Sequence, residues 1–204
     1  QSLKWANVKD HHAIWIGGSM GLFFLTTVEI FDGFSAEWGA SPADLIANVA
    51  GSGLFIGQQL GWGEQRISVK YSYHPTDYAQ YRPDVLGKNA VERVIKDYNG
   101  QTFWLSANIH SFLRPGSRFP RWLNVAAGYG AEGMLGGSEN PEEYNGTELP
   151  DFQRTSSYYL SLDVDLTRIP VRSKFLKGLF NIIGFVKIPF PTLEYNTGDQ
   201  FRFH

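Results

Sequence analysis

Four polar side chains near the start of the chain have types and spacing that could do chemistry. Glu29 and Asp32 lie three residues apart, so on a helix both carboxylates share one face, and Asp44 and Asn48, four apart, share a face of a second helix. Helices joined by a short loop are antiparallel neighbours, so the four side chains can converge at the turn. Such a cluster could act as acid and base, or bind a hard cation such as Ca²⁺ or Mg²⁺.

The same residues also have structural explanations. Ser41-Pro42-Ala43-Asp44 is typical of a helix start, with Ser41 as N-cap, Pro42 at the first helical position and Asp44 in the capping-box position. Glu29 and Asp32 fit a solvated helix end before the Asp32-Gly33 turn. We therefore keep the four residues as candidates, assign no catalytic residue and no cofactor, and leave a metal open.

These residues also carry a resemblance to a known family. Val28–Gly33 (V-E-x-F-D-G) and Trp38–Gly51 (W-G-A-S-x-x-D-L-x-A-N-x-A-G) resemble the YfiM-like family of uncharacterised bacterial envelope proteins, often outer-membrane or periplasmic lipoproteins. Segments 63–73, 96–102 and 129–135 resemble the longer, Bacteroidetes-type form. The resemblance implies an envelope location but no activity. It also implies an upstream helix and a signal sequence, and such a helix would have to complete any metal site.

The first sixty residues predict two small-residue-rich helices. The stretch 13–31 is apolar over about one membrane thickness but contains Glu29 and three glycines, so a spanning helix is the less favoured alternative. Gly17 with Gly21, and Ala47 with Gly51, have the spacing that lets two helices approach closely. Residues 17–21 also match G-x-S-x-G, but no parallel α/β pattern follows, so helix packing is the favoured explanation.

From Arg66 onward the hydrophobic period changes to two, which predicts antiparallel strands. Four strands are clear, at 67–74, 103–110, 123–132 and 158–167, and a weaker one lies at 191–195 or 201–204. Each places apolar side chains on one face and polar ones on the other, as in an outer-membrane wall or a soluble sheet with one wet face. Five strands are too few for a closed barrel, so helices, further residues or a partner must complete the sheet.

Two helices are expected within this second part. Residues 89–98 form a packing helix capped by Asn89. Residues 173–186 form an amphipathic helix, capped by Ser173, that suits a membrane interface or packing over the sheet. The predicted fold is α+β: a helical hairpin over 1–62 packed with an antiparallel meander sheet or partial outer-membrane β-barrel over 63–204. We expect the two parts to form one cooperative unit.

Composition narrows the functional classes. The 204 residues carry a net charge of −2, with a pI near 6.2, which argues against nucleic-acid binding. There is no cysteine, and 15% aromatic residues with 22 glycines suit a membrane-contacting β protein. Polar positions on the predicted sheet could line a wet interior or bind a ligand: Lys70, His110, Glu132, Asp163 and Asp165.

The favoured function is a non-catalytic protein of the bacterial outer membrane, embedded or on its periplasmic side. We expect its partners to be outer-membrane lipid and other envelope proteins in a larger complex, because the sheet is unfinished and one helix is amphipathic. The alternative is an enzyme or a cation- or ligand-binding protein that acts on lipid or cell-wall material through Glu29, Asp32, Asp44 and Asn48.

Overall fold

The computed structural model describes residues 8–33, 42–137, 139–198 and 200–204, and the side chains of 28–33, 42–44 and 200 lie outside that description. The chain divides into two compact units, residues 1–66 and residues 67–204, each of which is described by itself. Helices and an antiparallel sheet are both present, so the predicted α+β class is confirmed.

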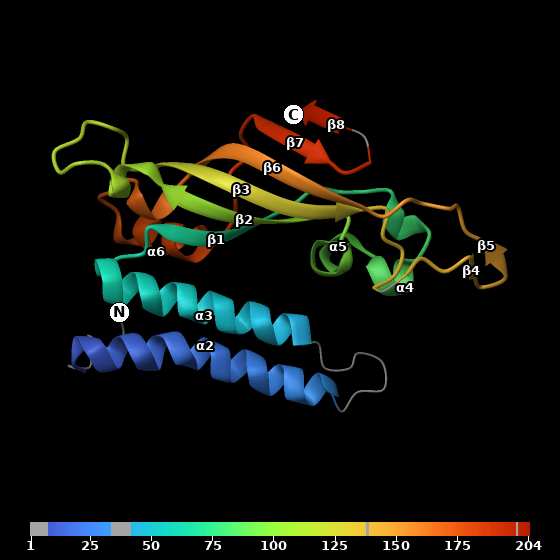
Figure 1. Ribbon diagram of the computed structural model, residues 1–204, viewed down its shortest axis with the longest axis horizontal. Coiled ribbons are helices and arrows are strands. Elements are labelled where there is room, and N and C mark those ends of the chain that lie inside the picture. Colours follow the sequence, from blue (N-terminus) through green and yellow to red (C-terminus); the bar gives the residue numbers. More distant parts are fainter. Residues whose placement is uncertain (1–7, 34–41, 138, 199) are drawn as a thin grey trace. The chain divides into compact units, whose positions relative to one another are not determined.

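The first unit is a pair of packed helices, α2 (Asp10–Gly33) and α3 (Pro42–Trp62) (Figure 1). Helix α3 begins at Pro42, as predicted from the proline at the first helical position. The Ser19 hydroxyl donates to the carbonyl oxygen of Trp15 at 2.6 Å, so this serine lies inside a helix and not on a strand-to-helix turn. Among the described residues, no helix is both long enough and apolar enough to cross a membrane.

Close packing of the two helices occurs at a different glycine from the ones expected. A Cβ atom added to Gly18 would meet the side chains of Ile56 and Phe55, whereas one added to Gly17, Gly21 or Gly51 would meet nothing within 4 Å. The prediction of contact through Gly17 and Gly21 is therefore wrong by one helix position. The spacing rule identifies small residues but does not say which of them faces the partner helix.

The second unit is built on a six-stranded, wholly antiparallel sheet with the strand order β1-β2-β3-β6-β7-β8. Its strands are β1 (Ile67–Tyr73), β2 (Gln101–Asn108), β3 (Leu123–Glu132), β6 (Thr155–Val164), β7 (Thr192–Asn196) and β8 (Gln200–Phe203). The four clear strands are confirmed, and the weaker one is two strands. The sheet is open, with β1 and β8 at its edges.

A two-stranded hairpin forms within residues 136–154, a segment rich in Gly, Asn and Pro that the sequence alone predicts as a polar loop. Strands β4 (Glu143–Tyr144) and β5 (Thr147–Glu148) are joined by Asn145 and Gly146, with φ angles of 52° and 79°. An Asn-Gly pair with two positive φ angles is the preferred connection of a tight hairpin. The loop prediction is therefore wrong at this point, although the turn signal was in the sequence.

Short helices and a small apolar core cover one end of the sheet. They are η1 (Tyr78–Gln80), α4 (Pro83–Leu86) and α5 (Ala90–Lys96). The side chain of Asn89 accepts from the Glu92 backbone at 3.0 Å, which confirms it as the cap of α5. Ala79, Leu86 and Leu135 are fully buried and form the core of this end.

The other end of the sheet carries two short turns and the amphipathic helix. These are η2 (Ile109–Phe112), η3 (Leu166–Arg168) and α6 (Lys174–Ile183), which begins after the predicted cap Ser173. Residues 185–187 then run beside β1: the Tyr71 backbone donates to Phe185 at 2.8 Å, and Lys187 donates to Tyr71 at 2.9 Å. From there the chain continues to β7.

Candidate functional site

The polar face of the sheet is a buried, hydrogen-bonded network. Lys70 on β1 and Asp163 on β6 form an ion pair at 2.7 Å, and both are almost completely shielded from solvent. The Ser106 hydroxyl donates to Asp163 at 2.6 Å, and the Asn124 amide donates to Ser106 at 2.8 Å. A buried charge is tolerated when it is paired and hydrogen-bonded, and this pair meets both conditions.

The ion pair requires the sheet to curl around its polar face. Strands β1 and β6 are separated by two strands, which is about 14 Å in a flat sheet, yet the two side chains meet. Lys187 crosses the same space and donates to Ser161 and to the Leu162 carbonyl at 3.1 and 3.0 Å. Burial lowers the pKa of Lys187 and the Lys70 charge adds to the lowering, while the Asp163 carboxylate opposes it.

A second cluster lies farther along the same face, around Glu194 on β7. Its carboxylate accepts from Ser157 at 2.7 Å and contacts the His204 ring nitrogen at 2.5 Å. Burial alone would raise the pKa of Glu194, but these hydrogen bonds and the charges of His204 and Arg202 hold it below its ordinary value. Glu194 is therefore a carboxylate that this face keeps charged.

A pocket of about 390 Å³, most of whose lining residues are polar, opens beside this cluster. It is lined by Ser72, His74, Thr102, Trp104, Glu132, Tyr159, Thr192, Glu194, Arg202 and His204. Burial raises the pKa of Tyr159 to about 12, so its hydroxyl stays protonated and can donate a hydrogen bond. The pocket can hold a small polar molecule or water, but the Glu194 carboxylate is already occupied by Ser157 and His204.

The opposite face of the sheet is apolar and exposed. An aromatic row crosses all six strands at one level of the register: Tyr71, Phe103, Tyr129, Tyr158, Tyr195 and Phe201 are consecutive cross-strand partners. Three neighbouring pairs of these rings meet edge-to-face or tilted: Tyr71 with Phe103 and Tyr129 with Tyr158 at 5.6 Å, and Tyr195 with Phe201 at 5.1 Å. Five of these six side chains are exposed, and Tyr71 is partly buried.

Mainly aliphatic side chains fill the two levels of the register next to the aromatic row. The first level, two residues away from the aromatic row on each strand, consists of the cross-strand partners Val69, Leu105, Ala127, Leu160, Leu193 and Phe203. The second level, two residues farther from the row, consists of Ile67, Ala107, Val125 and Leu162. Twelve large apolar residues on this face are exposed: Val69, Phe103, Leu105, Val125, Tyr129, Tyr158, Leu160, Leu162, Leu193, Tyr195, Phe201 and Phe203. The predicted alternation is therefore present, with polar side chains inside and apolar side chains outside.

The structure brings together only some of the polar residues expected on this sheet. Lys70 and Asp163 form the ion pair, and Glu132 lies at the pocket, where its carboxylate accepts from Asn196 at 3.4 Å. His110 and Asp165 lie beyond the strand ends, in η2 and at the start of η3. Asp165 pairs there with Arg168 at 3.2 Å, outside the buried network.

The acidic cluster expected in the hairpin falls mostly outside the described side chains. The backbone of Glu29 and Asp32 is helical in α2, that of Asp44 and Asn48 is helical in α3, and of these four side chains only that of Asn48 is described, as half-buried. Within the described residues, no group of three or more His, Asp or Glu side chains could hold a metal ion.

Sequence reasoning missed several members of the polar network. Ser106 and Asn124 alternate correctly along their strands, but nothing in the alternation separates a buried polar face from a wet one. Lys187 lies in an irregular segment after α6, and only the curled sheet brings it to Ser161.

Comparisons of the chain with protein-family models, curated proteins and solved structures find no match.

Proposed function

We propose that this chain is a non-catalytic, outer-membrane-associated envelope protein, and that the apolar face of its sheet contacts lipid. The observation that carries the proposal is the inverted burial of the sheet. Lys70 and Asp163 are 1% and 0% exposed, whereas Val69 and Leu160, on the other face of the same two strands β1 and β6, are each 52% exposed. A sheet folded for water has the opposite arrangement.

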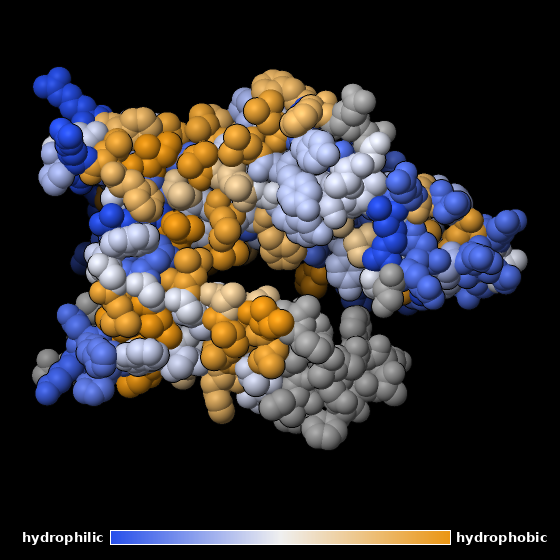
Figure 2. Space-filling model, viewed as in Figure 1, coloured by the Kyte–Doolittle hydropathy of each residue, from blue (hydrophilic) through white to orange (hydrophobic). Residues whose placement is uncertain are grey.

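The size of the apolar face supports lipid as its surroundings. Twelve half-exposed large side chains leave on the order of 1,000 Å² of apolar surface, against about 300–600 Å² for the largest patch on a typical soluble monomer. Figure 2 shows hydrophobic side chains over the strands and hydrophilic ones over the β4–β5 segment. An apolar band bordered by aromatic residues and then by polar segments is typical of proteins in the outer membrane.

The same geometry supports a role without catalysis. The strongest polar groups of the sheet bind one another: Lys70 with Asp163, Lys187 with Ser161, and Glu194 with Ser157 and His204. Groups that are satisfied in this way stabilise a curled sheet without needing a substrate. The resemblance to YfiM-like envelope proteins supports the same location.

The sheet edge supports assembly with a further envelope protein. Strand β8 is an edge strand, and Phe201 and Phe203 on it are among the most exposed aromatic residues of the sheet. An exposed, apolar edge strand presents backbone groups to which another strand can add. Native purification from detergent-solubilised outer membrane should recover the chain in a larger complex, and a detergent-independent soluble monomer would contradict this role.

The lipid contact is tested by vesicle flotation of the purified chain. The unaltered protein should float with phospholipid vesicles, and a variant carrying Leu105→Glu and Leu160→Glu should remain in the aqueous fraction, because each charge would enter hydrocarbon. A matched control with Thr147→Glu and Gln153→Glu adds the same charge at exposed positions away from the face and should still float. Flotation of all three proteins alike, or of none, would contradict the proposal.

A further inference from the structure

We propose that one end of the sheet, the basic end formed by residues 109–122 and 165–177, binds the anionic headgroups of a lipid surface, with α6 lying in the interface. This inference rests on the proposed lipid contact of the apolar face and adds to it the lipid class and the end of the sheet that meets it. Three observations support it: the positive charge of this end of the sheet, the amphipathic helix α6, and a pocket lined by basic and apolar residues.

The two ends of the sheet differ in charge. The basic end contains seven Arg and Lys residues, at positions 114, 118, 121, 168, 172, 174 and 177, and one carboxylate, Asp165, which leaves six positive charges in excess. The opposite end, residues 74–100 and 133–154, contains nine Asp and Glu against five Arg and Lys, which leaves four negative charges in excess. A net charge of −2 for the whole chain conceals this polarity.

The two segments of the basic end meet in space. The Asp165 backbone donates to the Trp122 carbonyl at 2.8 Å, which joins the two segments. Within the first segment, the Asn108 side chain donates to the Arg121 carbonyl at 2.7 Å and holds it near the end of β2. Helix α6 packs on η3, so its first turn lies at the same end. Trp122 and Phe112 are exposed there, and aromatic side chains of this kind favour the headgroup level of a membrane.

Helix α6 has the pattern of an interfacial helix. Lys174, Lys177 and Asn181 lie on one side at helical spacing, and α6 contains no acidic residue. The other positions are apolar, and Phe175 and Ile182 are 77% and 71% exposed. A helix whose large apolar side chains face outward and whose polar side is basic lies in the plane of an anionic membrane surface.

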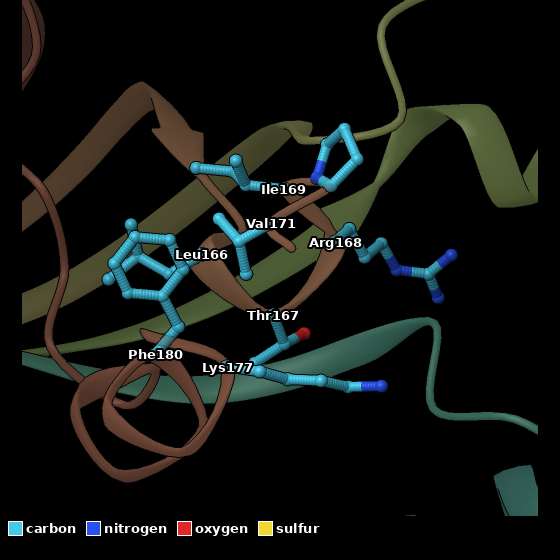
Figure 3. A pocket seen from close by; sticks show the side chains of 8 residues that line it. Leu166, Thr167, Arg168, Ile169, Val171, Lys177 and Phe180 are labelled. Atoms are coloured by element: carbon cyan, nitrogen blue, oxygen red, sulfur yellow. The ribbon is translucent and has the colours of Figure 1, made fainter. Parts of the chain in front are cut away.

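A pocket of about 220 Å³ lies between α6 and η3 and combines the two chemistries that a lipid headgroup needs. Leu166, Val171 and Phe180 group on one side of it, whereas the charged ends of Arg168 and Lys177 extend in the same direction on the other (Figure 3). The Arg168 guanidinium also pairs with Asp165 at 3.2 Å, which holds it in place. A phosphate beside Lys177 with its alkyl part against Phe180 would satisfy both sides of the pocket.

The test compares binding to neutral phosphatidylcholine vesicles and to vesicles with 30% phosphatidylglycerol, for the unaltered chain and two paired variants. Each basic residue near an anionic surface contributes about fivefold to binding, so Lys174→Gln with Lys177→Gln should lower binding to the anionic vesicles by about twenty-fivefold. The same variant should bind neutral vesicles as the unaltered chain does. High salt should remove most of the preference of the unaltered chain for anionic vesicles.

The matched control removes two lysines from the other end, through Lys88→Gln and Lys96→Gln, and should keep the preference for anionic vesicles. Equal binding of the unaltered chain to neutral and anionic vesicles would overturn this inference and leave the proposed lipid contact standing. An equal loss in both paired variants would also overturn it. Absence of binding to either kind of vesicle would instead contradict the proposed function itself.

Discussion

The two faces of the same sheet follow opposite rules of burial. On one face Lys70, Asp163 and Glu194 are shielded from water and paired, and on the other an aromatic row and two aliphatic rows are exposed. Both faces come from the same strands, so the local backbone is the same and only the surroundings differ. The contrast teaches that alternation fixes which residues share a face, while the environment decides which face is turned inward.

The largest expected effect concerns the buried ion pair. Asp163→Ala leaves Lys70 charged and buried without its carboxylate and should lower the free energy of unfolding by about 3–5 kcal/mol. With both variants measured in one detergent solution, Leu160→Ser on the exposed face should lower the free energy of unfolding by about 1 kcal/mol or less. Urea unfolding followed by tryptophan fluorescence measures both. A larger loss for Leu160→Ser than for Asp163→Ala would invert the proposed roles of the two faces.

A smaller effect on stability is expected at Gly128, where the Trp104 ring on the polar face packs against the backbone. A Cβ atom at Gly128 would lie 2.7 Å from Cε3 of Trp104, and further ring atoms are within 3 Å. Because Trp104 is buried, Gly128→Ala should cost about 1–3 kcal/mol of unfolding free energy. At Gly137 the added atom would meet nothing within 4 Å, so Gly137→Ala is the matched control. Equal stability of the two variants would show that Trp104 can move aside.

The pH dependence of stability tests whether Glu194 is held as a carboxylate on the polar face. Its pKa is below the ordinary 4.5 in the folded chain, because hydrogen bonds and positive neighbours outweigh the effect of burial. Its stabilisation is therefore full above the unfolded pKa and is lost as the pH falls through the folded pKa.

As the pH falls below about 5, through the unfolded pKa of Glu194 and then through its lower folded pKa, the stability of the unaltered chain should therefore fall more steeply than that of Glu194→Gln. Chemical unfolding at a series of pH values measures the two slopes, and the other acidic groups are common to both proteins. Parallel slopes would mean that Glu194 gains nothing from its folded surroundings.

The smallest expected effect repeats the contrast between packed and open positions in the helical hairpin. Gly17→Ala on α2 enters open space and should stabilise the helix by about 0.5–1 kcal/mol, because alanine has the higher helix propensity. Gly18→Ala meets Ile56 and Phe55 and should lose that gain. Thermal unfolding followed by circular dichroism compares them, and an equal gain in both would place Ile56 away from Gly18.

Local patterns predicted the elements better than the site. The period-two alternation located β1 and β3 closely, and Asn89 and Ser173 marked the starts of helices. The alternation was extended too far at His110, because Asn108 ends its strand by capping the following turn through the Ser111 backbone.

Contacts distant in sequence could not be predicted in this way. The pairing of Lys70 with Asp163 depends on the curl of four strands, and the position of Lys187 depends on where the segment after α6 crosses the polar face. No local propensity encodes either distance. The sequence therefore predicted which residues alternate onto the polar face, whereas only the tertiary structure shows how they bind one another.

The most direct test of the lipid contact is the depth of a spin label on the apolar face. The chain has no cysteine, so Leu160→Cys gives a single labelling site on β6, and Thr147→Cys gives an exposed control on β5. In vesicles the label at position 160 should be accessible to oxygen and protected from a water-soluble nickel complex, with the opposite result at position 147. Equal access of the nickel complex to both labels would contradict the contact of this face with lipid.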